Sequence, residues 1–213
     1  MTIRHHPSDE MLAAFVGGTL NAGRQVVIAS HVEQCSDCRR FVRAIEQVAG
    51  NMLEDIDPTS LVSDALSRTL QRLGEPGQVA SQARMISEDG RSLPASLRGH
   101  RRGAWRWVGF GVRMQSVDVP NSGNVRVFLL KGAPGIKLPQ HTHTGNELTS
   151  ILAGSFSHEG GCFAAGDFED ADDRVEHRPV VGSNEECLCL VALEGRLRLT
   201  GFLGVLLNPF VRL

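Results

Sequence analysis

The hydrophobic pattern changes its period once along the chain, and this change constrains the fold more than any other feature. Up to about residue 75, apolar residues recur every three to four positions, as they do on one face of a helix. Beyond about residue 103 they alternate or cluster among β-branched and aromatic neighbours, as in short strands. With 213 residues the chain is long enough for two small domains. We therefore predict a two-domain protein, α followed by all-β.

The first half carries start signals for four helices. Ser8 is the expected N-cap of the first helix, with two carboxylates in the following turn. Asn21 is the expected cap of the second, and the third begins around Ser36. Asp57 precedes a proline, an arrangement typical of a fourth helix start. These signals predict a four-helix domain over residues 1–80.

The middle of the chain is polar and is broken by Gly, Pro and Ser, so we expect a linker over residues 81–103. The strand pattern that follows begins near Trp105 and Trp107 and continues through several short apolar stretches separated by turn signals. Strands of this length and spacing favour a small β-barrel or sandwich over residues 104–213.

Charge and composition exclude several classes of function. The formal net charge is −2, from 22 basic and 24 acidic residues, so no global basic field favours nucleic acid or an acidic membrane. Residues 1–85 hold eight Arg, no Lys and ten acids, again a sum of −2, which disfavours a DNA-binding zinc module. The sequence shows neither a membrane-spanning run nor a signal-peptide core, so we expect a cytoplasmic protein. Five unevenly spaced cysteines do not resemble a disulfide framework.

A Cys/His motif lies where the second predicted helix meets the third. His31, Cys35 and Cys38 spell H-x3-C-x2-C. Residues four apart share one face of a helix, and the x2 spacing folds Cys38 back toward the same point. Zinc prefers four Cys or His ligands in a tetrahedral array. The sequence therefore predicts a zinc site whose fourth ligand is His6, with His5 as the alternative.

This motif within a short helical N-terminal domain is similar to the zinc-binding anti-sigma family. The resemblance covers residues 1–80 and places the ligands at His31, Cys35 and Cys38, with His6 as the fourth. It implies that the helical domain binds an extracytoplasmic-function sigma factor and blocks its use by RNA polymerase.

A second metal-ligand motif lies among the predicted strands. The pattern G-x5-H-x-H-x3-E-x6-G runs without a gap and contains His141, His143 and Glu147. Alternate residues of a strand point to one face, so both histidines enter the barrel, and a turn returns Glu147 toward them. His177 is the expected fourth ligand and His158 the alternative. Three imidazoles and a carboxylate suit Zn, Mn, Fe(II), Ni or Co.

The complete pattern resembles the first motif of the cupin superfamily, which implies a cupin β-barrel or jelly roll. The second cupin motif departs from the family pattern. Ala164 stands where a proline is expected, and Gly166-Asp167 stands ten residues before His177 instead of two. We expect the intervening acidic run, residues 169–173, to form a loop.

The pairing of both motifs resembles the ChrR-type anti-sigma factors over nearly the whole chain. The resemblance implies a non-enzymatic anti-sigma factor that forms a 1:1 complex with its sigma factor. It also implies a cupin that senses singlet oxygen or related oxidants. Rival interpretations are a cupin metalloenzyme, of the dioxygenase or isomerase class, and a zinc-dependent DNA-binding repressor.

Three cysteines lie outside the predicted zinc site. Cys187 and Cys189 would share one face of a strand, either as a redox pair or as two small buried residues. Cys162 is expected to lie in the core.

Overall fold

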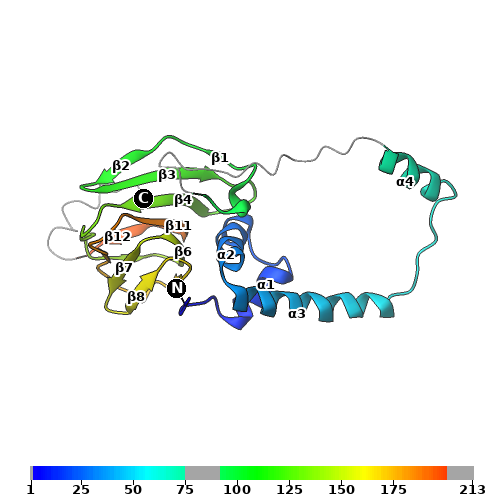
Figure 1. Ribbon diagram of the computed structural model, residues 1–213, viewed down its shortest axis with the longest axis horizontal. Coiled ribbons are helices and arrows are strands. Elements are labelled where there is room, and N and C mark those ends of the chain that lie inside the picture. The colour runs from blue at the N-terminus through cyan, green and yellow to red at the C-terminus, as the bar shows by residue number, and fades with distance from the viewer. Residues whose placement is uncertain (1, 75–91, 201–213) are drawn as a thin grey trace.

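The computed structural model describes residues 2–74 and 92–200, and its helices precede its strands as the sequence predicts (Figure 1). The first part of the expected linker and the end of the chain lie outside the described residues. The helices are α1 (Asp9–Val16), α2 (Ala22–Gln34), α3 (Ser36–Met52), the 3-10 turn η1 (Leu53–Asp55), α4 (Ala65–Gly74) and the 3-10 turn η2 (Ala95–Leu97). The strands are β1 (Arg101–Arg102), β2 (Arg106–Gly109), β3 (Val112–Asp118), β4 (Val125–Gly132), β5 (His141–His143), β6 (Glu147–Ala153), β7 (Ser155–His158), β8 (Gly161–Ala164), β9 (Phe168–Ala171), β10 (Val180–Val181), β11 (Cys187–Glu194) and β12 (Leu197–Leu199).

The predicted caps of the first two helices are confirmed. The Ser8 hydroxyl accepts a hydrogen bond from the backbone N–H of Met11 at 3.2 Å. The Asn21 side chain accepts one from Arg24 N–H at 3.0 Å. Each bond satisfies one of the N–H groups that a helix start leaves without a partner.

The predicted start of the fourth helix at Asp57 is wrong, because α4 begins at Ala65. The residues between η1 and α4 include Leu61 and Val62, both largely exposed. A short helix gains most of its stability from packing its apolar face, and this segment has no such packing. No helix among the described residues is long and apolar enough to cross a membrane.

The strands form one large and two small antiparallel sheets. The large sheet has the order β1-β3-β4-β11-β6-β9, with β2 paired to β3 at one edge. The small sheets have the orders β10-β7-β8 and β12-β5. The small sheets lie across the core from the large one, so the predicted barrel or jelly-roll architecture is confirmed.

Strand β11, near the centre of the large sheet, is buried on both of its faces. Leu188 and Leu190 face a core shared with the helices, whereas Cys189 and Val191 face the interior of the barrel. Helix α2 lies against the outer face, to which it contributes the fully buried Val27 and Ile28. A strand buried on both faces needs apolar residues at successive positions, as β11 has from Cys187 to Leu193. The two halves therefore share one continuous core.

Part of the expected linker also belongs to this core. Leu93 and Leu97, the latter in η2, are buried with the helices against the outer face of the sheet. The carboxylate of Glu33 on α2 accepts hydrogen bonds from the backbone N–H groups of Ala95 and Ser96, each at 2.6 Å. These contacts attach residues 92–97 to α2.

Gly23 lets α2 approach β4 closely, and we expect Gly23→Ala to destabilise the protein. A Cβ at this position would lie 2.9 Å from Val125 Cγ1 and 3.0 Å from Val127 Cγ2. Overpacking of this kind costs about 1–3 kcal/mol. Gly50→Ala on α3 is the matched control, because among the described residues nothing outside its own helix backbone and its chain neighbours lies within 4 Å of its Cβ position. The free energy of unfolding of that control should rise by about 0.5–1 kcal/mol, because Ala is favoured over Gly inside a helix. Urea unfolding measures both, and a Gly23→Ala protein as stable as the parent would contradict the packing described.

Candidate metal centres

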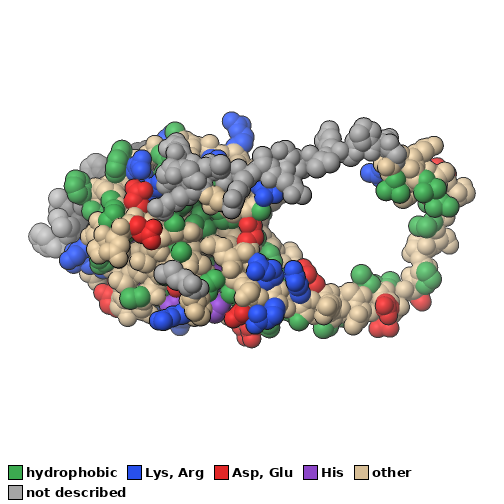
Figure 2. Space-filling model, viewed as in Figure 1, with side chains coloured by type: hydrophobic (Ala, Val, Ile, Leu, Met, Phe, Trp, Pro, Cys, Tyr) green, Lys and Arg blue, Asp and Glu red, His purple; other side chains and the backbone are tan. Residues whose placement is uncertain are grey.

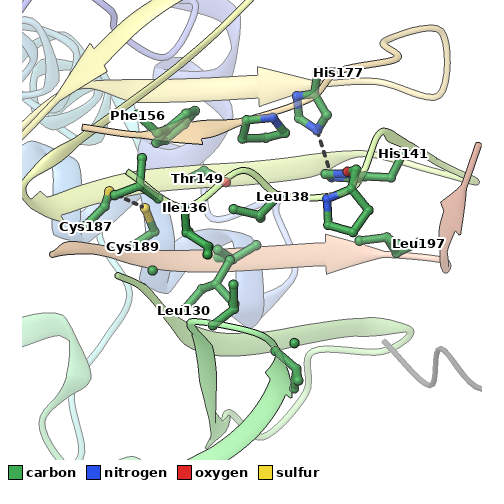
Figure 3. A pocket seen from close by; sticks show the side chains of 18 of the residues that line it. Leu130, Ile136, Leu138, His141, Thr149, Phe156, His177, Cys187, Cys189 and Leu197 are labelled. Atoms are coloured by element: carbon green, nitrogen blue, oxygen red, sulfur yellow. Dashed lines mark hydrogen bonds between the residues drawn. The ribbon is translucent and has the colours of Figure 1, made fainter. Parts of the chain in front are cut away.

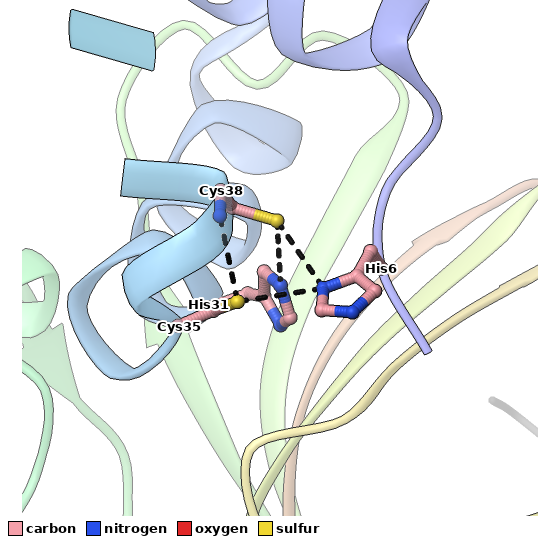
Figure 4. A group of neighbouring side chains, drawn as sticks. All are labelled: His6, His31, Cys35 and Cys38. Carbon is pink, nitrogen blue, oxygen red and sulfur yellow. Dashed lines mark hydrogen bonds between the residues drawn. The ribbon is translucent and has the colours of Figure 1, made fainter. Parts of the chain in front are cut away.

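The first cluster forms where α2 meets α3 (Figure 4). Cys35 ends α2 and also caps α3, so the chain turns sharply at this residue. The turn brings His31, in the last turn of α2, to Cys38, in the first turn of α3, with His31 Nε2 3.2 Å from Cys38 Sγ. His6, which precedes α1, completes the group, and its Nδ1 lies 3.4 Å from both Cys35 Sγ and Cys38 Sγ.

The four ligand atoms of this cluster are spaced as a tetrahedral metal site requires. All lie within 4.8 Å of one another. Ideal Zn–S and Zn–N bonds place neighbouring ligand atoms about 3.5 Å apart, close to the 3.2 and 3.4 Å found here. The group can hold one metal ion.

Burial changes the pKa of two groups in the first cluster. Burial, with a further contribution from Cys35, raises the pKa of the Cys38 thiol to about 12. Burial and the nearby His6 lower the pKa of His31 to about 4, so its imidazole is neutral at pH 7. A bound cation would stabilise the two thiolates and release their protons.

His5, the alternative ligand, points away from this cluster. Its ring lies 4.4 Å from that of Phe163, and its Nδ1 lies 3.4 Å from an oxygen of Asp167. The structure thus brings His6, and not His5, to the cysteines.

The first cluster lies directly against β9. Asp167 accepts hydrogen bonds from the backbone N–H groups of Arg4 and His5, at 2.7 and 3.1 Å. The N–H of Phe168 donates to the carbonyl of His5 at 3.1 Å. The ring of His31 packs edge-on against Phe168, with centroids 5.6 Å apart.

The second cluster lies inside the barrel. His141 and His143 come from β5, where their alternation points both inward, and both are buried. His177 arrives from a loop whose backbone bonds reciprocally to His141, with N···O distances of 3.1 and 3.0 Å. Glu147, at the start of β6, places a carboxylate oxygen 3.3 Å from His143 Nε2. The structure therefore brings the three predicted histidines into one group, and Glu147 contacts that group through His143.

The tautomer of His141 follows from its neighbour. Its Nδ1 lies 2.8 Å from the carbonyl of Pro139. A carbonyl only accepts, so Nδ1 carries the proton and Nε2 keeps a free lone pair. That Nε2 lies 3.0 Å from His177 Nε2. His177 Nε2–H therefore donates to this lone pair, and a cation that both rings bind would take the place of that proton.

Charge in the second cluster is divided between carboxylate and imidazole. Burial raises the pKa of Glu147, but the nearby histidines outweigh it and the net shift is downward. Burial lowers the pKa of His141 to about 4. For His143, burial lowers the pKa, but the contact with Glu147 outweighs it and the net shift is upward. The Glu147 carboxylate and the neutral imidazole of His141 are donor types that suit a first-row divalent metal.

The structure places two further residues beside the second cluster. Glu169 was expected in a loop but belongs to β9, and His158, the alternative fourth ligand, has a side chain only 4% exposed and lies against Glu169. His158 Nε2 lies 2.5 Å from Glu169 Oε1. Burial raises the pKa of Glu169, but His158 and His177 outweigh it and hold the pKa at about 2. The available signal was that Phe168 and Ala171 flank the acidic pair 169–170, so that the acidic run is interrupted by apolar residues.

A mostly apolar cavity of about 350 Å³ extends from the second cluster through the barrel (Figure 3). The thiols of Cys187 and Cys189 line it away from the histidines, with their sulfur atoms 3.6 Å apart. The hydrogen bond with Cys187, together with burial, raises the pKa of Cys189. Cys162, expected in the core, is exposed, so that prediction is wrong. Apolar residues on the cavity wall include Leu130, Ile136, Leu138, Phe156 and Leu197.

Comparison with known proteins identifies both halves. The sequence-family model of the ChrR cupin-like domain matches residues 100–195 of this chain. The anti-sigma-E factor ChrR of Cereibacter sphaeroides is 35% identical over 213 residues, which cover all of both chains. The crystal structure of Rhodobacter sphaeroides SigE in complex with the anti-sigma ChrR matches with a TM-score of 0.75 and 32% identity. That match covers 91% of this chain and all of the other.

The fold and the two clusters define a cupin protein with an N-terminal helical Cys/His module. The chain belongs to the ChrR family of anti-sigma factors. The predicted fold class and family are thereby confirmed, and the chain is an anti-sigma factor, not an enzyme.

We expect Cys38→Ser to lose one metal equivalent and part of the helical signal. The cluster joins the segment before α1 to the turn after α2, and a structural metal contributes directly to folding. Cys162→Ser is the control, since that exposed thiol belongs to neither cluster. Metal analysis and far-UV circular dichroism measure both. Full metal content and unchanged helicity in Cys38→Ser would contradict the assignment.

Proposed function

We propose that this anti-sigma factor binds an extracytoplasmic-function sigma factor one to one through its helical part, and releases it when the cupin part meets an oxidative signal. The observation that carries the proposal is the full-length similarity to ChrR, which has been solved in complex with SigE. The region of binding and the metals are inferred from the described residues, and the signal from the resemblance to the ChrR-type anti-sigma factors.

The binding surface that we propose is the arm formed by the end of α3, η1, the following segment and α4. In Figures 1 and 2 this arm extends away from the rest of the described residues, with apolar side chains along it. Large exposed apolar surfaces mark sites of protein association. The exposed apolar residues of the arm are Val48, Met52, Leu53, Ile56, Leu61, Val62, Leu66, Leu70 and Leu73.

Helix α4 is the clearest part of this surface. Leu66, Leu70 and Leu73 are 71%, 57% and 76% exposed and follow the i, i+4, i+7 spacing of one helical face. An amphipathic helix of this kind docks into an apolar groove of a partner. The sigma factor supplies that groove in the proposed complex.

Zinc is the metal that we propose for the first cluster, since two thiols and two imidazoles are a donor set typical of structural zinc. It would join the segment before α1 to the α2–α3 turn and so support the base of the arm. For the second cluster we propose a divalent first-row metal held by His141, His143, Glu147 and His177.

Strand β9 provides the route between the clusters in this proposal. Phe168 contacts His31 of the first cluster on one face, and Glu169 lies 3.7 Å from His177 of the second on the other. Release requires two states of the chain whose affinities for the sigma factor differ by a few kcal/mol. In this proposal, a change at His177 is transmitted through Glu169 and the adjacent Phe168 to His31, at the base of the arm.

Substitution of the α4 face tests partner binding. We expect Leu66→Asp or Leu70→Asp to weaken the sigma complex by at least about 30-fold, equivalent to about 2 kcal/mol for a central apolar contact. Both side chains are exposed, so the free protein should keep its stability. Gln71→Ala on the same helix is the control. Co-expression with candidate sigma factors identifies the partner, and calorimetry measures affinity. A chain that forms no complex, or unchanged affinity in both aspartate variants, would refute the proposed surface.

The signal is tested at the cupin. His141→Ala/His143→Ala removes two ligands that lie away from the arm, so we expect intact sigma binding but no release under singlet oxygen. Cys187→Ser/Cys189→Ser tests the rival trigger, oxidation of the paired thiols. A reporter gene under the control of the sigma factor is the readout. Normal induction in the histidine variant would place the sensor elsewhere, with the thiols examined first.

A further inference from the structure

We infer that Glu169 is a positioning residue for the metal site of the cupin. Its carboxylate accepts the Nδ1 proton of His177, and His158 holds that carboxylate in place. This inference rests on the metal binding proposed above, and it assigns a role to a buried pair that the metal-ligand motif does not contain.

When His177 binds a cation through Nε2, its proton lies on Nδ1. Its Nε2 faces the Nε2 of His141, whose lone pair is free because its own Nδ1–H donates to Pro139. For both Nε2 atoms to bind one cation, His177 must carry its proton on Nδ1. That nitrogen is buried and has no hydrogen-bond partner among the described residues. A buried N–H in this position needs an acceptor.

Glu169 supplies the acceptor for this N–H group. Glu169 Oε1 lies 3.7 Å from His177 Nδ1, somewhat longer than a hydrogen bond. A small rotation of either side chain brings the pair to about 2.9 Å, the usual N–H···O distance. Metal-bound histidines commonly donate their second N–H to a carboxylate, which fixes the orientation of the ring and strengthens the ligand.

His158 holds the carboxylate of Glu169 in place. The backbone N–H of Gly160 donates to His158 Nδ1 at 3.0 Å, so the proton of the neutral ring is on Nε2. That Nε2–H donates to Glu169 Oε1 at 2.5 Å. The ring of His158 is stacked on Phe163, with centroids 5.2 Å apart, and lies 4.9 Å from the ring of His177. The chain of contacts from Gly160 to His177 is continuous.

A separate ion held by His158, Glu169 and His177 is the alternative, because their ligand atoms also lie within 4.8 Å of one another. The tautomers disfavour it. His158 Nε2–H already donates to Glu169, and His177 could serve two ions only by losing the proton from both nitrogens. His158 and Glu169 are therefore better suited to orient His177 than to bind a second cation.

Cobalt-loaded full-length protein tests the inference. The first cluster has thiolate ligands and gives sulfur-to-cobalt charge-transfer bands, whereas the second has none, so absorption follows each site separately. In chelator competition, we expect Glu169→Gln to lose about 10- to 100-fold in affinity at the cupin site, with the first site unchanged. In zinc-loaded protein, the ¹H–¹⁵N signal of His177 Nδ1–H should shift upfield in the same variant, because its acceptor has lost its charge.

Two further variants separate positioning from general effects on folding. Asp170→Asn changes the next residue of β9, which is exposed, and should leave affinity and the imidazole signal unchanged. His158→Leu should weaken the cupin site through Glu169 alone. The double variant Glu169→Gln/His158→Leu should therefore lose no more affinity than Glu169→Gln.

The outcomes that overturn the inference are distinct. Equal cupin affinity in Glu169→Gln and the parent overturns it and leaves the proposed metal site intact. Losses that add in the double variant, or two cobalt ions in the parent cupin, would show that His158 is itself a ligand. A parent cupin that takes up no metal overturns the proposed site together with this inference.

Discussion

Burial of the large sheet on both of its faces is the constraint on which the rest of the structure depends. Strand β11 is apolar at successive positions because its even-numbered residues meet the helices and its odd-numbered residues meet the barrel interior. The hydrophobic effect favours both contacts, so α2 is held against the sheet without any metal. Gly23 brings α2 close enough for its side chains to pack between those of the strands. The helical part is thus not a free module joined by a tether.

This packing fixes where the two clusters lie relative to each other. The segment that carries His6 is hydrogen-bonded to Asp167, and His31 packs on Phe168. Glu169, the next residue, turns into the barrel beside His177. Successive residues of a strand face opposite ways, so one strand separates the two groups while contacting both. Sites that are about 100 residues apart in sequence are therefore neighbours across a single strand.

The sequence predicted those features whose signals are local. Ser8 and Asn21 cap helices because their side chains reach an N–H three residues on, and His141 and His143 share a face because strands alternate. It did not predict features that depend on distant partners. From the sequence alone, Glu169 is predicted to lie in an acidic loop. Its position in the barrel depends on the pairing of β6 with β9 and on the donor that His158 supplies. The late start of α4 has the same origin, since nothing among the described residues covers the apolar side chains of the segment before it.

The two clusters differ in what holds their ligands before any cation binds. The backbones of His141 and His177 are bonded to each other, and β5 fixes His143, so the sheet itself assembles most of the second cluster. In the first cluster, His6 comes from an irregular segment whose backbone is hydrogen-bonded to Asp167 and Phe168, while its imidazole reaches the α2–α3 turn. A cation there would join elements that the core leaves only loosely connected, whereas a cation in the barrel would occupy a site already formed. Chemistry at the second cluster can therefore change without unfolding its surroundings, which is what a sensing site requires, while the first is suited to holding the arm in place.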